Sequence, residues 1–171
     1  MKTECICGES KKMDEKTRLL LKELTLNSRQ SDREIAKKLK TTQPTISRLR
    51  KKLEKEKIIE NYTFIPNLSK MNIELISFIT IKWKDYNQKK TLEEFRQFLK
   101  VDKNVLFSAP GEGFDNKTKI IMAFHKNYME YELFLRDIRA KYNDMIENMD
   151  SFLISTEHII TNFDFNIVSR L

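Results

Sequence analysis

Apolar residues recur at helical spacing soon after the start of the chain. Leu19, Leu20 and Leu24 lie on one side of this pattern, and Asp14, just ahead of it, is a suitable N-cap. A polar run at residues 27–30 interrupts the pattern. The sequence therefore predicts a first helix between Asp14 and this run.

Two further helical patterns follow, joined by a very short turn. Ser31 and Glu34 form a capping box, in which each side chain satisfies a free backbone donor at the start of the second helix. Thr42 caps the third helix, and Pro44 lies in its first turn, where proline is tolerated. The apolar stripes of the two helices are Ile35, Ala36 and Leu39, and then Ile46, Leu49 and Leu53. Two helices joined by so short a turn, with a small alanine where they meet, are typical of a helix-turn-helix.

The second half of the chain alternates strand and helix patterns. Strands are predicted at residues 75–83, 105–109, 119–124 and 152–160. One helix is predicted from residue 91, with an apolar stripe that reaches Leu99, and another at residues 128–142. The first of these helices opens with a capping box at residues 91–94. The order β-α-β-β-α-β is that of a ferredoxin-like fold, a four-stranded antiparallel sheet with two helices on one face. A separate strand at residues 58–65 is predicted as a wing or hinge strand.

The sequence thus predicts an α+β protein with two domains. We expect a polar tail at residues 1–12, a winged helix-turn-helix domain at 13–66, a linker at 67–73 and a ferredoxin-like domain at 74–171. A chain of 171 residues has room for two small domains. Its 40% hydrophobic residues are sufficient for a packed core.

Positive charge is concentrated in the first third of the chain. The net charge is +7, from 32 Lys and Arg against 25 Asp and Glu. Residues 1–66 contain 17 basic and 10 acidic side chains, whereas residues 67–171 contain 15 of each. The whole excess belongs to the predicted helix-turn-helix domain, which favours a polyanionic partner for that domain.

The third helix, at residues 42–56, has the surface expected of a recognition helix. With its apolar stripe inward, short polar groups face solvent near its start and basic groups face solvent further along. Short side chains can reach base edges in the major groove, and Lys and Arg meet phosphates. We expect Gln43, Thr45 and Ser47 to contact bases. The full set of predicted DNA contacts is Thr42, Gln43, Pro44, Thr45, Ser47, Arg48, Arg50, Lys51, Lys52 and Lys55, with Lys37 and Lys40 from the preceding helix and turn. The alternative is that these residues are only the solvated face of a charged helix.

The residues of this region carry a family resemblance. The run SDREIAKKLKTTQPTISRLRKKLEKEKII, followed by ENYTFIPNL, resembles the DNA-binding half of the Lrp/AsnC (feast/famine) transcription regulators, in an archaeal-type version. The remainder is similar to the regulatory domain of that family, so the resemblance covers residues 13 to about 162. It implies a positioning helix at residues 31–39 before the recognition helix. Lys40 stands where the family usually has glycine, so we expect a turn conformation open to a residue with a Cβ.

The resemblance also implies partners. These are double-stranded DNA and a second copy of the chain, which pairs through the sheet to make a homodimer. A higher oligomer of dimers and the transcription machinery are further expected partners. A small-molecule effector, such as an amino acid, is expected near the loop between the second and third strands of the regulatory domain. The candidate residues there are Gly111, Gly113 and Asp115, and the alternative is a plain hairpin turn with a surface aspartate.

No catalytic constellation and no metal site can be assembled from the sequence, so we expect no cofactor. Cys5 and Cys7 have no further cysteine beside them, and His125 and His158 lie far apart along the chain. The two cysteines are interpreted as part of a mobile tail, with an intersubunit disulfide or a shared metal as the alternative. No apolar run approaches the ~20 residues that span a bilayer, and no leader is recognisable. A cytoplasmic protein without membrane contact is expected.

Two other functions are compatible with the sequence. One is a sirohaem decarboxylase-like enzyme, because some proteins that resemble this family keep its two-domain plan. Such an enzyme has no need of a basic recognition helix. The other is an effector-sensing protein with a vestigial DNA-binding half, which would dimerise without affinity for a duplex. The positive charge of residues 1–66 favours the DNA-binding regulator, which is not an enzyme.

Overall fold

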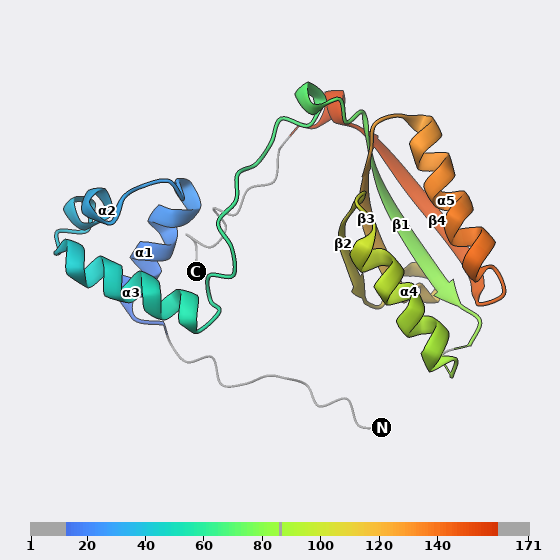
Figure 1. Ribbon diagram of the computed structural model, residues 1–171, viewed down its shortest axis with the longest axis horizontal. Coiled ribbons are helices and arrows are strands. Elements are labelled where there is room, and N and C mark those ends of the chain that lie inside the picture. Colours follow the sequence, from blue (N-terminus) through green and yellow to red (C-terminus); the bar gives the residue numbers. More distant parts are fainter. Residues whose placement is uncertain (1–12, 86, 161–171) are drawn as a thin grey trace. The chain divides into compact units, whose positions relative to one another are not determined.

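The computed structural model describes residues 13–85 and 87–160. Its contacts divide the described chain into two compact units that meet between Ile65 and Pro66 (Figure 1). The first unit is helical, and the second combines helices with a sheet. Each unit is described by itself below.

Three helices form the first unit: α1 (Glu15–Leu26), α2 (Asp32–Lys38) and α3 (Gln43–Lys55). The three predicted N-caps are confirmed. Asp14 accepts a hydrogen bond from the Thr17 backbone at 2.7 Å, Ser31 and Glu34 form the predicted capping box, and Thr42 accepts from the Thr45 backbone. The apolar stripes meet in one core, made of Leu20, Leu24, Ile35, Ala36, Ile46 and Leu53. This core holds α3 so that its polar side stays outside.

The helices α2 and α3 end in the same way, and both ends carry a lysine in the left-handed region. Lys40 has φ 48° and Lys57 has φ 57°. In each case the following residue donates back into the last turn, Thr41 to the Ala36 carbonyl and Ile58 to the Leu53 carbonyl, both at 2.9 Å. These are Schellman motifs, in which glycine is the usual left-handed residue. The expectation that Lys40 avoids the glycine-like conformation is wrong, because the backbone bonds of this turn require it.

The strand predicted at residues 58–65 does not form in the described part of the first unit. These residues follow the end of α3 as an irregular segment, and residues 13–57, the rest of the described part of this unit, contain no strand to pair with them. A strand needs a neighbour for its backbone groups, so β-branched and aromatic composition alone does not make one. Ile59 instead packs against the helical core, while Phe64 is 76% exposed.

The second unit has the predicted β-α-β-β-α-β order. Its elements are β1 (Leu75–Trp83), α4 (Lys89–Val101), β2 (Val105–Pro110), β3 (Lys119–His125), α5 (Tyr128–Tyr142) and β4 (Ile146–Ser155), with short 3-10 turns at Ser69–Met71, Phe114–Asn116 and Thr156–His158. The strands form one antiparallel sheet in the order β2-β3-β1-β4. This arrangement is the expected ferredoxin-like sheet.

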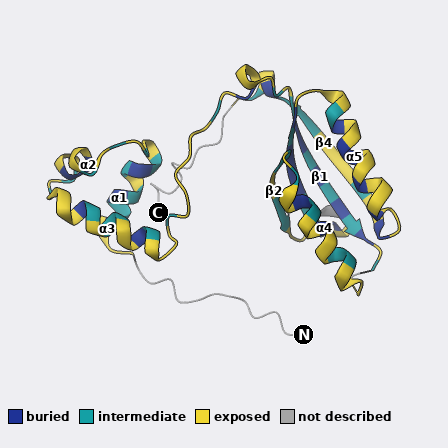
Figure 2. Cartoon of the chain, viewed as in Figure 1, coloured by how far each residue is buried: buried dark blue, intermediate teal, exposed yellow. Residues whose placement is uncertain are grey.

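The main core of the second unit lies between the sheet and the helices α4 and α5. Alternate residues of β1 point into it, namely Ile79, Ile81 and Trp83, where they meet Phe95 of α4 and Ile138 of α5. Figure 2 shows exposed residues along the outer sides of both helices and buried ones along β1. On the opposite face of the sheet, a smaller cluster contains Leu68, Ile76 and Met122. Leu68 falls in the predicted linker, which here packs on the sheet.

Two predicted boundaries in this unit are wrong. The helix α4 begins at Lys89 with Gln88 ahead of it and has no side-chain cap, so the predicted capping box at residues 91–94 lies inside its first turns. The last strand begins at Ile146 and ends at Ser155, whereas residues 152–160 were predicted. Its first half is polar because β4 is an edge strand, and Asp150 pairs there with Lys117 of the β2–β3 loop at 2.6 Å. His158 consequently lies in a 3-10 turn and not in a strand.

Candidate nucleic-acid interface

The start of α3 exposes four of the residues predicted to meet DNA. Thr42, Gln43, Pro44 and Thr45 are all exposed, whereas Ser47 is half-buried. The hydroxyl oxygens of Thr42 and Thr45 lie 2.8 Å apart, so each is a hydrogen-bond partner of the other. The side chain of Gln43 makes no hydrogen bond within the described residues. Its amide is therefore available to a ligand.

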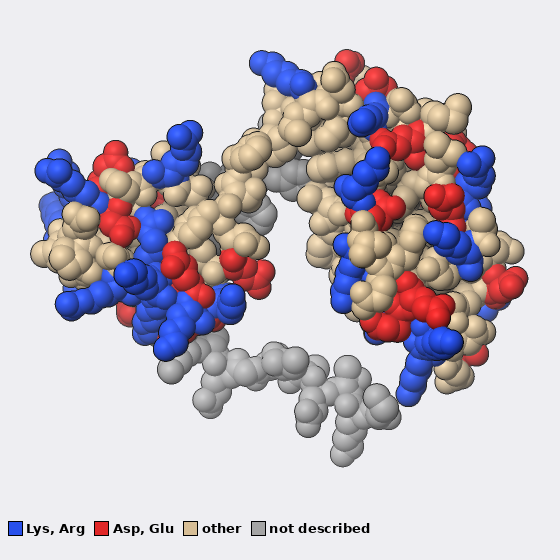
Figure 3. Space-filling view, viewed as in Figure 1, with Lys and Arg blue, Asp and Glu red and all other residues tan. Residues whose placement is uncertain are grey.

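Basic side chains continue along the exposed side of α3. Arg48, Lys51, Lys52 and Lys55 are exposed, and Lys52 makes only a long contact of 4.0 Å to Glu56. The other three have no ion pair or hydrogen bond to any residue in the described ranges. Figure 3 shows Lys and Arg predominating over this unit and mixed with Asp and Glu over the other. Exposed and unpaired cations are what a phosphate backbone requires.

Lys37 and Lys40 lie beside this surface, at the end of α2 and in the turn that follows. Both are exposed, and neither forms an ion pair within 4 Å with a residue that the structure describes. Lys38, between them, instead reaches Glu23 of α1 at 2.7 Å and so joins two helices. The left-handed turn at Lys40 presents that cation next to the start of α3.

Arg50, which was also predicted as a DNA contact, has partners within the protein. Its Nε donates to Asp32 at 2.7 Å and its Nη2 donates to the Gln30 carbonyl at 3.2 Å. The guanidinium also lies over the Tyr62 ring, 5.7 Å from its centroid, and the Tyr62 hydroxyl donates to Glu54 at 2.7 Å. Arg50 thus joins the start of α2, the middle of α3 and the segment after α3. The helical pattern alone could not reveal this, because Asp32 and Tyr62 are brought to Arg50 by the tertiary fold.

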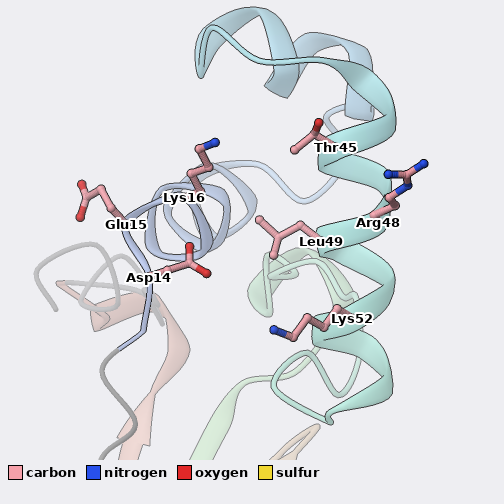
Figure 4. Close-up of a pocket in the computed structure, with 7 residues that line it drawn as sticks. All are labelled: Asp14, Glu15, Lys16, Thr45, Arg48, Leu49 and Lys52. Atoms are coloured by element: carbon pink, nitrogen blue, oxygen red, sulfur yellow. The ribbon is translucent and has the colours of Figure 1, made fainter.

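A groove runs between the start of α1 and the outer side of α3 (Figure 4). Leu49 lies between the two helices, while Arg48 points away from α1. Glu15 on α1 is paired with Arg18 at 2.8 Å, and Asp14 is used as the cap of that helix. The complete lining is Asp14, Glu15, Lys16, Thr45, Arg48, Leu49 and Lys52. The acidic side chains of this groove are thus engaged at the start of α1, and among the described residues its basic side chains make no ion pair closer than the 4.0 Å contact of Lys52 with Glu56.

The candidate effector residues lie in the loop between β2 and β3. Gly111, Gly113 and Asp115 are exposed, and the loop is closed by bonds from the Gly111 amide to Thr118 and from the Gly113 amide to Lys117. The left-handed conformations fall on Asp115 and Asn116, not on the glycines. The structure places the three candidates in one loop but does not test whether they bind a ligand.

A buried histidine in the second unit was not singled out as functional from the sequence. His125, at the end of β3, is 1% exposed and shares a hydrogen bond of 2.8 Å between its Nε2 and Ser77. Its Nδ1 is buried and has no partner among the described residues. Burial holds the pKa of His125 below its ordinary value of 6.5, although the Glu130 and Asp102 carboxylates oppose this. Its position matches the predicted strand exit, and no sequence signal distinguishes it.

Neither a metal-ligand cluster nor a membrane-spanning helix occurs in the described ranges. No group of three or more His, Cys, Asp or Glu side chains is placed to hold a metal ion there. None of the described helices combines the length and the apolar character that crossing a bilayer requires. Cys5 and Cys7 lie outside the residues that the structure describes.

Sequence similarity to known proteins is found in the first unit. The winged helix-turn-helix DNA-binding family matches residues 13–60. An uncharacterised HTH-type transcriptional regulator of Pyrococcus abyssi is 37% identical over 71 residues, which are 42% of this chain and 47% of that protein. The chain spans about half the length of the curated relatives it matches.

Solved structures extend the likeness to both units. A transcriptional regulator of Neisseria meningitidis, crystallised as a complex with L-Met, has a TM-score of 0.77 at 17% identity, and the match covers 90% of this chain and 95% of that one. An AsnC family transcriptional regulator from Agrobacterium tumefaciens has a TM-score of 0.77 at 18% identity, with the same coverage. The chain is therefore similar to the winged helix-turn-helix DNA-binding family over residues 13–60, and its two units have the fold of these two regulators.

Proposed function

We propose that the protein is a sequence-specific transcription regulator of the Lrp/AsnC (feast/famine) family that binds double-stranded DNA. The recognition helix α3 lies in the major groove in this proposal, and the second domain pairs two copies. The observation that carries the proposal is the exposed side of α3. It offers unpaired cations on the same helix as an uncommitted amide, in a domain of a DNA-binding family.

The exposed residues of α3 divide into two roles. Gln43 and Thr45, near the start of the helix, are the residues proposed to contact bases, together with the half-buried Ser47. The cations further along neutralise phosphates and so contribute affinity without sequence preference. This second group is Arg48, Lys51, Lys52 and Lys55, with Lys37 and Lys40 beside them. Thr42 and Pro44 border the base-reading end.

Arg50 receives a different role from the one that its position in the sequence suggests. Its donors are directed to Asp32 and Gln30, and its planar group covers Tyr62. We assign it as a positioning residue that holds α3 against α2. A guanidinium engaged in this way has little capacity left for a phosphate.

The proposal is tested with full-length protein on a preferred duplex and on random duplexes of the same length. Replacing Gln43 and Thr45 by Ala should weaken binding to the preferred duplex by roughly fivefold or more and leave random duplexes nearly unchanged. Replacing Arg48 and Lys51 by Ala should weaken both equally. Equal losses on both duplexes for the first pair would remove the base-contact assignment. Dimers without measurable affinity for any duplex would instead favour the vestigial alternative.

The proposed homodimer forms through the face of the sheet that α4 and α5 leave open. One row of apolar side chains crosses this face, because Phe107 pairs with Met122, Met122 with Phe78, and Phe78 with Phe152. Phe152 is 68% exposed, although it is a large aromatic side chain. An exposed apolar surface of this kind favours pairing with a second copy. A dimer would present two recognition helices to a pseudo-palindromic site.

An effector in the second domain is a further part of the proposal. The regulator of Neisseria meningitidis that shares this fold was crystallised with L-Met. A small molecule of this class, an amino acid, is therefore proposed near Gly111, Gly113 and Asp115. Calorimetric titration with single amino acids, repeated with Asp115→Ala, tests this. If no amino acid gives a heat signal, the proposed effector site is wrong, and the proposal of DNA binding is not affected.

A further inference from the structure

If the proposed function is correct, the side chains in the first turn of α3 limit which bases the helix can recognise. This turn contains no charged side chain. Its exposed residues are Thr42, Gln43, Pro44 and Thr45, and the first cation of the helix, Arg48, lies one turn further on. Guanine is most often read by a bidentate Arg or Lys. The first turn of α3 lacks the group that this contact requires, and the nearest cations, Lys40 before it and Arg48 after it, are the ones assigned to phosphates.

The two threonines of this turn are engaged with each other. The Thr42 and Thr45 hydroxyl oxygens lie 2.8 Å apart, and Thr42 also accepts a hydrogen bond from the Thr45 backbone as the helix cap. The polar atom of Thr45 is therefore partly used within the helix. What this exposed residue adds to the surface is its Cγ2 methyl, next to the ring of Pro44 in the chain. Pro44 and Thr45 thus offer apolar groups in the same first turn as the Gln43 amide, with Gln43 and Thr45 on the two sides of Pro44.

One base pair matches both features. In the major groove, thymine alone carries a methyl group, and adenine presents an N7 acceptor beside an N6 donor. A glutamine amide can donate to N7 and accept from N6, and a threonine methyl can pack on the thymine methyl. We infer that the start of α3 reads A·T pairs, with adenine bound by Gln43 and a thymine methyl contacted by Pro44 and Thr45. Arg48 then follows as the first phosphate contact.

The test uses chemically altered duplexes and the full-length protein. The preferred site is first selected from a library of random duplexes. Each thymine is then replaced by deoxyuridine, which removes only the methyl, and each adenine by 7-deazaadenine, which removes only N7. We expect one position in each half-site to lose about fourfold on methyl removal, the effect of one methyl in an apolar contact. Removal of N7 at one adenine should cost roughly fivefold or more.

Matched variants assign these losses to residues. With Thr45→Ser, which keeps the hydroxyl and removes the methyl, thymine and deoxyuridine should bind equally at that position. With Thr45→Val, which keeps a methyl, the preference for thymine should persist. With Gln43→Ala, 7-deazaadenine should no longer weaken binding. Such loss of discrimination in a double-mutant cycle is not produced by a variant that is merely less stable.

Other outcomes overturn the inference. A selected site with G·C pairs at the positions read by α3 would contradict it, as would equal affinity for thymine and deoxyuridine throughout. So would losses that survive Thr45→Ser and Gln43→Ala unchanged. In each of these cases salt-dependent binding to the duplex still supports the proposed function. Absence of binding to every duplex, at low salt as well, would overturn both.

Discussion

At two positions a lysine supplies positive charge where the backbone conformation favours glycine. Lys40 and Lys57 end α2 and α3, at positions where glycine is usual in Schellman motifs. A residue with a Cβ in this region costs roughly 1–2 kcal/mol. At Lys40 the chain keeps a cation next to the recognition helix. We infer that the charge of Lys40 strengthens DNA binding, and that this gain offsets the loss of folding stability caused by the left-handed conformation.

Lys40→Gly should therefore stabilise the first domain by about 0.5–1 kcal/mol, because glycine relieves the strain but loses more chain entropy on folding. Amide hydrogen exchange of α2 and α3 in the full-length protein measures this. Lys40→Ala is the matched control, since it removes the charge and keeps the Cβ. Both variants should bind DNA more weakly, and only the glycine should slow exchange. Equal amide exchange rates in the two variants would contradict the claim that the backbone at Lys40 is strained.

His125 is the second residue whose environment predicts a measurable effect. It is enclosed by Ser77, Tyr131 and Phe134, and the carboxylates of Glu130 and Asp102 are the charged groups that act on it. Burial nevertheless holds its pKa below 6.5, so the folded state favours the neutral ring. Protonation is then easier in the unfolded chain. The stabilising effect of the neutral ring is present above pH 6.5 and is lost as the pH falls from there through the folded-state pKa.

Urea unfolding of the second domain should accordingly show a free energy that declines below pH 6.5. The decline cannot exceed about 1.4 kcal/mol per pH unit, the limit for one proton. Trp83 is the single tryptophan and lies in the core of this domain, so its fluorescence reports the transition. His125→Gln removes the titrating group and should flatten this part of the profile. An identical decline in that variant would mean that a group other than His125 takes up the proton.

At the scale of elements, the ion pair of Arg50 with Asp32 connects three segments that adjoin the proposed DNA-binding surface. The start of α2, the middle of α3 and the segment containing Tyr62 all meet at one guanidinium. Both side chains of the pair are largely buried, so the loss of one partner leaves the other unsatisfied. Arg50 therefore contributes to how α3 is held, while the neighbouring Lys51 is exposed and has no such role.

This contrast predicts different effects for two neighbouring substitutions. Arg50→Ala should destabilise the first domain by about 1–3 kcal/mol and leave the salt dependence of DNA binding unchanged. Lys51→Ala should change stability by less than about 0.5 kcal/mol and reduce the slope of log affinity against log salt by about one. Thermal unfolding and titrations at several salt concentrations separate the two effects. A reduced slope with Arg50→Ala would restore Arg50 as a phosphate contact.

The elements that sequence reasoning predicted correctly are those specified by local chemistry. Asp14, Ser31 and Thr42 were recognised as caps because a cap depends on neighbours within four residues. The apolar stripes were recognised because burial on one side imposes the helical period. The exposed side of α3 followed from those stripes, since it is what remains outside, while its contact with DNA stays a prediction.

Features that depend on distant partners could not be predicted in this way. The segment at residues 58–65 has the composition of a strand, but the described residues of its unit offer no strand to pair with. The polar first half of β4 reads as a loop, although pairing with β1 makes it a strand from Ile146. The partners of Arg50 lie 18 residues before it and 12 residues after it. Each of these is a tertiary contact, which a local pattern does not encode.

At the scale of the whole molecule, charge and apolar surface are divided between the two domains. The first domain carries the entire positive excess, and the second has balanced charges together with an open apolar face on its sheet. One domain is thereby suited to a polyanion and the other to a second copy of itself. This division underlies the proposal of a dimeric regulator.

The dimer proposal predicts that a charge on the open face, at Phe152 of the edge strand β4, separates the protomers. Phe152→Asp should shift the mass measured by light scattering from that of a dimer to that of a monomer, because a carboxylate would be buried without a partner. Tyr128→Asp is the matched control, since Tyr128 is an equally exposed aromatic residue on α5, away from this face. A dimer that survives Phe152→Asp would place the contact elsewhere.

The most direct test of DNA binding by the basic side of α3 is a titration of full-length protein with a labelled duplex at increasing salt. The six proposed phosphate contacts of each first domain, at Arg48, Lys51, Lys52, Lys55, Lys37 and Lys40, predict a linear fall of log affinity with log salt. The slope for one domain should approach about −5, and substitution of Arg48 and Lys51 should reduce it by about two. An affinity that does not change with salt, or no binding at the lowest salt, would contradict the account.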